Sequence, residues 1–96
     1  MKEEWIPMLH PDVVWRTMDD GAVLVKPQAG RVRVLNEVGT TIWQLMDGKR
    51  DLAQIEATLV EKYDVGPEQA KNDLRKFLRE LMVRDLIVWI SGGPDR

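Results

Sequence analysis

The chain has 96 residues, no cysteine, and a net charge of −2 from 14 basic and 16 acidic side chains. This length fits one small domain, and the charge balance argues against a protein whose main task is to hold nucleic acid. The lack of cysteine excludes disulfides and zinc–thiolate sites. No apolar run reaches the roughly 20 residues that span a bilayer, and the acidic start is unlike a signal peptide, so we expect a cytoplasmic protein without a membrane partner.

The first third of the sequence predicts an extended arm and three strands. The arm is expected over residues 1–12, which contain two prolines. The strands are short β-branched or aromatic runs at residues 13–15, 22–25 and 31–34. They are separated by the turn signals Asp19-Asp20-Gly21, where the glycine can take a positive φ, and Gln28-Ala29-Gly30. We therefore predict a three-stranded antiparallel meander, and in its third strand arginine and valine alternate between the two faces.

The remainder of the sequence predicts three helices. They are expected over residues 36–47, 52–63 and 67–84, from apolar residues at helical spacing. Asn36 and Asp51 are good N-caps, Gln54 stands in the capping-box position, and Pro67 suits a first helical residue. Residues 86–90 are candidates for a short final strand, and residues 91–96 for a flexible tail.

This order of elements indicates the fold class. Strands segregated from helices indicate an α+β architecture, and three short helices beside a small sheet favour a winged helix-turn-helix type. We expect one domain over residues 13–90.

The sequence offers no constellation of catalytic residues. The single histidine, His10, has no nucleophile or orienting partner in sight, and Asp19-Asp20 is more typical of a turn than of a cation site. We therefore predict no enzyme, no catalytic residue, no metal site and no cofactor.

A winged-helix DNA-binding or regulatory module is the alternative that the helix order suggests. Such a module places one helix in the major groove. The third predicted helix, however, interleaves acids such as Asp73 and Glu80 with its basic residues. A solvated face of mixed charge explains that helix, so we expect no nucleic-acid partner. A third alternative is a dimeric scaffold that accompanies an enzyme without binding a peptide.

Residues 35–65, LNEVGTTIWQLMDGKRDLAQIEATLVEKYDV, resemble the PqqD-like family. That family has a strand ending in LN, a small residue and glycine, an IW-like pair, L-x-D-G, and a capped helix ending in EYDV. The match continues upstream to HPDVVWR and downstream to Asp73, Phe77, Leu78 and Leu81, and it covers about 80 residues in order. The coincidence of capping, small and aromatic positions makes the resemblance specific.

The resemblance implies a RiPP recognition element, which binds the leader segment of a ribosomally synthesised precursor peptide and presents it to a modifying enzyme. In that family the leader is added as a strand to the third strand, in a cleft beside the third helix. The sequence allows this β-augmentation, since the third strand of a meander can be an edge. Arg31 and Arg33 on that strand would also attract an acidic leader.

The expected peptide-binding residues lie on the third strand and the third helix that border this cleft. They are Arg31, Val32, Arg33, Val34, Leu35, Asp73, Leu74, Lys76, Phe77, Glu80 and Leu81. For Phe77, Leu74 and Leu81, plain core packing is the competing interpretation. The expected partners are the precursor peptide and a maturation enzyme, and the chain itself is expected to be a monomer or weak homodimer. The motif LNEVGTTIW favours a lasso peptide leader protease over the radical enzyme of pyrroloquinoline quinone biosynthesis.

Overall fold

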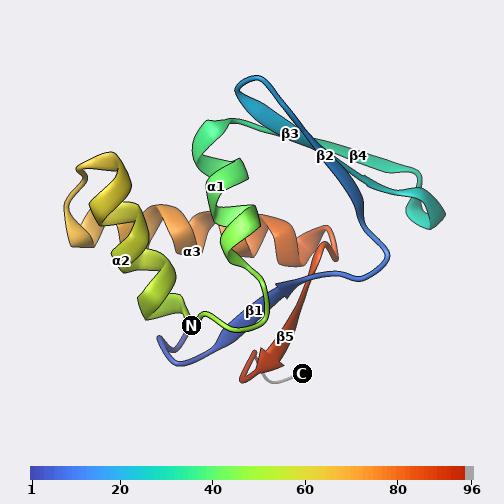
Figure 1. Cartoon of the computed structure of the whole chain (residues 1–96). Helices are drawn as coiled ribbons and strands as arrows, with labels where there is room; N and C mark the ends of the chain where they lie inside the picture. Colours follow the sequence, from blue (N-terminus) through green and yellow to red (C-terminus); the bar gives the residue numbers. More distant parts are fainter. Residues whose placement is uncertain (95–96) are drawn as a thin grey trace.

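Residues 1–94, the part of the chain that this computed structural model describes, fold into two small antiparallel sheets and three α-helices (Figure 1). In chain order the elements are β1 (Ile6–Leu9), β2 (Val14–Met18), β3 (Gly21–Lys26), a 3-10 turn η1 (Pro27–Ala29), β4 (Arg31–Leu35), α1 (Glu37–Leu45), α2 (Leu52–Tyr63), α3 (Pro67–Val83) and β5 (Ile87–Ser91). The predicted α+β class, the meander, the three helices and the short C-terminal strand are confirmed. The predicted third strand is β4.

The segment expected to be an extended arm contains a strand. β1 runs antiparallel to β5, with Met8 opposite Val88, and Pro7 is fully buried. Trp5 packs edge-on against Trp89, with ring centroids 5.3 Å apart. The β1–β5 ribbon lies on the other side of α3 from the three-stranded sheet (Figure 1). The expected arm and tail therefore each contribute residues to this ribbon, while residues 95 and 96 of the tail lie outside the described residues.

The three-stranded sheet has the order β2-β3-β4, so β4 lies at an edge. Leu35 of β4 lies opposite Ala22 of β3, and Arg33 lies opposite Leu24. Gly21 begins β3, and its φ is not positive, contrary to the expectation for a turn glycine. A Cβ at Gly21 would instead lie 2.1 Å from the carbonyl oxygen of Leu35. Glycine is needed here because the backbones of β3 and β4 approach closely.

The hydrophobic core lies between the inner face of this sheet and the three helices. Its fully buried residues include Trp43, Ile42, Leu24, Leu52, Ile55, Leu74, Leu78 and Leu81. Trp15 of β2 meets Trp43 of α1 edge-on at 6.3 Å between ring centroids. α1 therefore packs against the sheet through an aromatic contact that accounts for two of the four tryptophans.

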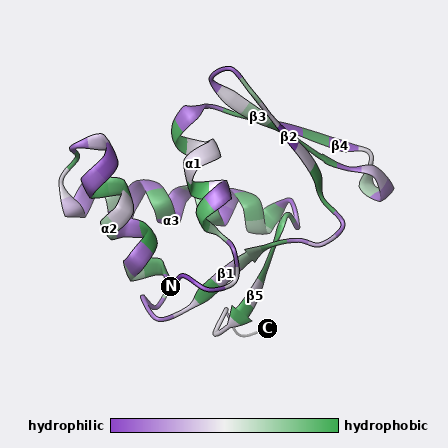
Figure 2. Cartoon of the chain, viewed as in Figure 1, coloured by the Kyte–Doolittle hydropathy of each residue, from purple (hydrophilic) through white to green (hydrophobic). Residues whose placement is uncertain are grey.

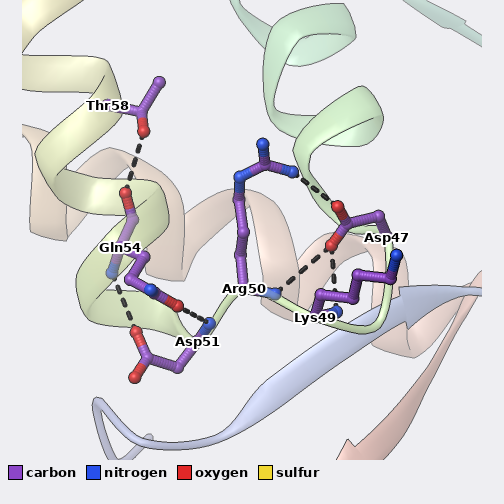
Figure 3. Close-up of polar contacts among 6 residues, drawn as sticks. All are labelled: Asp47, Lys49, Arg50, Asp51, Gln54 and Thr58. Atoms are coloured by element: carbon purple, nitrogen blue, oxygen red, sulfur yellow. Dashed lines mark hydrogen bonds and ion pairs between the residues drawn. The ribbon is translucent and has the colours of Figure 1, made fainter.

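The N-caps that the sequence predicts are present at the starts of α1 and α2. The Asn36 side chain accepts a hydrogen bond from the backbone N–H of Gly39 at 2.8 Å. Asp51 and Gln54 form the reciprocal capping box of α2 (Figure 3). In the preceding turn the carboxylate of Asp47 accepts hydrogen bonds from the backbone of Lys49 and Arg50 (Figure 3). These contacts end α1 and start α2 within six residues, which fixes how the two helices meet.

The opposite face of the sheet is apolar and exposed. We call it the outer valine face, and it consists of Val14, Met18, Val32 and Val34, each more than half exposed. Figure 2 shows stretches of apolar colour along β3 and β4. Arg31 and Arg33 consequently point toward the helices, because successive side chains on a strand alternate between the faces.

A buried lysine joins the sheet to the end of α3. Lys26 is 8% exposed, and its Nζ donates to the Asp85 carbonyl oxygen at 2.9 Å and to the Asp85 carboxylate at 2.7 Å. This hydrogen bond from Lys26 holds the pKa of Asp85 below its ordinary value. Asp85 itself has a φ of 56°, a conformation that asparagine and aspartate tolerate.

Replacing Gly21→Ala is expected to lower the free energy of unfolding by about 2–3 kcal/mol, because the new methyl group overlaps the Leu35 carbonyl oxygen. Gly66→Ala is the matched control, since its Cβ would meet nothing within 4 Å and its φ is −66°. That control should change stability by less than about 1 kcal/mol. Urea unfolding of both variants checks this, and equal losses would contradict the close approach.

The Asp85 carboxylate is expected to make stability depend on acid. Because its pKa is lowered in the folded chain, its contribution is present above the unfolded pKa near 3.8 and is lost as the pH falls through the folded value. Asp85→Asn keeps a residue that tolerates the backbone conformation. The stability gap between wild type and variant should therefore shrink from pH 6 toward acid in urea titrations. A gap independent of pH would contradict the role of the carboxylate.

Candidate functional site

The outer edge of β4 carries backbone groups that no other strand uses. Met18 and Gly21 flank a two-residue turn, and the flanking residues of such a turn form a hydrogen-bonded pair. Since hydrogen-bonded and non-hydrogen-bonded pairs alternate along an antiparallel ladder, Arg33 and Leu35 exchange hydrogen bonds with β3. Val32 and Val34 therefore direct their N–H and C=O groups away from the sheet.

A groove runs between this edge and α3. It is lined from the β4 side by Arg33, Val34, Leu35 and Asn36, and from α3 by Asp73, Lys76, Phe77 and Glu80. The four α3 residues share one face of the helix, because positions three, four and seven apart are neighbours. The hollow measures about 320 Å³ and is open to solvent.

A second hollow continues the groove toward the start of α1. It is lined by Asn36, Val38, Gly39, Ile42, Asp73 and Phe77, three of which also line the first. A Cβ at Gly39 would lie 3.5 Å from the Phe77 ring and 3.2 Å from the Asn36 oxygen. The absence of a side chain at Gly39 thus keeps this mainly apolar end open.

The groove contains paired and unpaired charges. Arg33 Nη2 and Glu80 Oε1 form an ion pair across it at 2.5 Å. Arg33 Nη1 also donates to the Val34 carbonyl oxygen. Within residues 1–94, Asp73 and Lys76 form no ion pair and Arg33 Nε has no acceptor, although that nitrogen is buried. The groove is therefore electrically balanced but keeps free hydrogen-bonding capacity.

The structure brings together seven of the expected site residues, namely Arg33, Val34, Leu35, Asp73, Lys76, Phe77 and Glu80. Arg31 and Val32 lie farther along β4 and do not line either hollow. Leu74 and Leu81 are fully buried in the core, so their side chains do not reach the groove. Both leucines lie on the face of α3 that packs into the core and not on the face that lines the groove.

Sequence reasoning missed Asn36, Val38, Gly39 and Ile42 as lining residues. Asn36 is also the N-cap of α1, which is the role that the sequence predicts for it. The glycine at position 39, in the first turn of a helix, was the available signal, because glycine there lowers helix stability unless space is required.

No group of three or more histidine, cysteine, aspartate or glutamate side chains within residues 1–94 is placed to hold a metal ion. His10 Nδ1 accepts a hydrogen bond from the backbone N–H of Asp12, in the connection between β1 and β2. Along the same part of the chain, every helix is too short or too polar to cross a membrane.

A family model and a known relative both match this chain. Residues 21–87 match the family model for coenzyme PQQ synthesis protein D (PqqD). A PqqA binding protein from Rhizobium meliloti (strain 1021) is 35% identical over 65 residues, which are 68% of this chain and 64% of that protein. The chain therefore spans just under two thirds of that relative's length.

Two solved structures have the same fold. TbiB1 in complex with the TbiA(beta) leader peptide is 31% identical, with a TM-score of 0.80 over 92% of this chain and 99% of that one. The PqqD part of Methylobacterium extorquens PqqCD, a stand-alone RiPP recognition element, is 25% identical, with a TM-score of 0.72 over 86% and 88% of the two chains.

Amide hydrogen exchange in the free chain checks the open edge. The N–H groups of Val32 and Val34 should exchange at least about tenfold faster than those of Arg33 and Leu35, which bond to β3. Two-dimensional NMR after transfer to heavy water resolves these four amides. Equal protection along β4 would mean that its outer groups are already paired.

Proposed function

The chain belongs to the PqqD family, and on that premise we propose that it binds the leader segment of a ribosomally synthesised precursor peptide. The leader is added as a strand along the free edge of β4 and lies in the groove beside α3. The single observation that carries this proposal is the groove itself, in which an open strand edge faces an exposed helix face.

The open edge supplies the main-chain part of the binding. An added strand gains hydrogen bonds from the outward groups of Val32 and Val34, whatever the leader's sequence. Alternate side chains of that strand point toward α3, where Phe77 and the hollow beside Gly39 accept an apolar residue. Backbone pairing thus gives affinity, and the helix wall gives selectivity.

The relatives support this assignment by what they bind. TbiB1 was solved with a leader peptide, and the Rhizobium protein is a PqqA binding protein. In the proposal this chain acts without catalysis and presents the bound leader to a maturation enzyme in the cytoplasm. The motif LNEVGTTIW favours a leader protease of a lasso peptide pathway over a radical enzyme.

We do not propose DNA binding, although the helix order alone suggested it. The groove face of α3 carries Asp73 and Glu80 beside Lys76, and a phosphate backbone would meet both carboxylates. The net charge of −2 adds no general attraction for nucleic acid.

Titration of the ¹⁵N-labelled chain with the leader of a precursor encoded beside its gene tests the proposal. Backbone amide shifts are expected at residues 32–35 and at residues 73–80, because these are the two walls of the groove. Shifts at neither wall at saturating leader would contradict leader binding.

Val34→Pro is expected to weaken leader binding by at least about tenfold, because proline removes an outward N–H and crowds the added strand. Stability should fall by less than about 1 kcal/mol, since an edge strand tolerates proline where the N–H faces outward. Val34→Ala is the control that keeps the backbone donor and should bind nearly as well as wild type. Calorimetry and urea unfolding measure both quantities, and parallel losses would place the residue in an interior strand.

A further inference from the structure

The side chain of Arg33 hydrogen-bonds to a backbone acceptor that a bound strand would need. Its guanidinium is tied to Glu80 on α3 and to the carbonyl oxygen of Val34 on its own strand. That carbonyl is one of the outward acceptors of β4. In the free chain the edge is therefore partly occupied from within, and an incoming strand competes with Arg33 for the same acceptor.

The guanidinium of Arg33 also keeps one N–H donor without an acceptor. Its Nε is buried and has no acceptor among the described residues, and the side chain is 28% exposed. A buried donor without a partner is unfavourable, so a ligand that supplies an acceptor is favoured. A carboxylate fits best, because it accepts from Nε and a terminal nitrogen of the same guanidinium at once.

The two unpaired charges that line the hollow with Arg33, on Lys76 and Asp73, have opposite signs. Neither forms an ion pair within residues 1–94, so together they favour neither sign of charge, and the preference for an acidic ligand group rests on Arg33. The carboxylate of Glu80 is already paired with Arg33. Arg31, on the same face of the same strand, does not line the groove, so the two arginines of β4 have different surroundings.

We propose that Arg33 masks the edge of β4 in the free chain and determines specificity by exchanging Glu80 and Val34 for an acidic side chain of the leader. The acidic residue lies on the side of the added strand that faces α3. This inference rests on the proposed function, to which it adds the chemical class of one leader residue.

A peptide selection tests the preference without knowledge of the natural leader. A display library of random short peptides is selected on the wild-type chain, after removal of peptides that bind the Val34→Pro chain. The recovered peptides are expected to share an aspartate or glutamate at one fixed position. Selection on Arg31→Gln should give the same preference, and selection on Arg33→Gln should abolish it.

The outcomes separate the two proposals. Peptides recovered on Arg33→Gln with the same acidic preference would overturn the role of Arg33 while leaving peptide binding intact. No peptide recovered on the wild-type chain would contradict peptide binding itself, and the subsite with it. Thermal unfolding of each variant establishes that the chain used is folded.

A double-mutant cycle on one selected peptide gives the magnitude. Changing its acidic residue to the amide should weaken binding to the wild-type chain by at least about tenfold and leave binding to Arg33→Gln nearly unchanged. Glu80→Gln should strengthen binding of the acidic peptide several-fold, because Glu80 no longer competes for Arg33. Equal losses on both chains, or weaker binding to Glu80→Gln, would overturn the exchange.

Discussion

β4 pairs with β3 so that Leu35 lies opposite Ala22 and Arg33 opposite Leu24. This register decides which residues face the helices and which face solvent. A slip of one residue would turn Val32 and Val34 inward and carry Arg33 away from Glu80. The close approach of Gly21 to the Leu35 carbonyl oxygen and the short 3-10 turn that joins β3 to β4 keep the register in place. The same register leaves the backbone groups of Val32 and Val34 on the open edge. The pairing of β3 with β4 therefore determines both the packing of the sheet and the strand edge of the groove.

α3 serves the core and the groove at the same time. Leu74, Leu78 and Leu81 are fully buried on one face, while Asp73, Phe77 and Glu80 line the groove on the next. Because protein interiors are closely packed around such buried leucines, the helix cannot shift without disturbing the core. The groove is therefore a largely preformed site whose width is set by the core. The side chain of Arg33 joins the two walls, because it pairs with Glu80 on α3 and donates to the Val34 carbonyl oxygen on β4.

The sequence predicted features that depend on neighbouring residues. The caps at Asn36 and Asp51 and the meander have local signals and were confirmed. The pairing of β1 with β5 was not predicted, because it joins segments about 80 residues apart and leaves no local pattern. In the site, seven of eleven expected residues meet in the groove. Leu74 and Leu81 are buried in the core, and periodicity could not show this because it gives a helix's apolar stripe but not which member of it lies at the margin.

The central claim is that the edge of β4 accepts the leader as an added strand. An isotope-filtered NOE spectrum of the labelled chain with unlabelled leader tests it most directly. The claim predicts cross-strand contacts between the leader backbone and the backbone of Val32 and Val34, together with side-chain contacts to Phe77. Contacts confined to β2 or to the outer valine face, with none along the outer edge of β4, would contradict it.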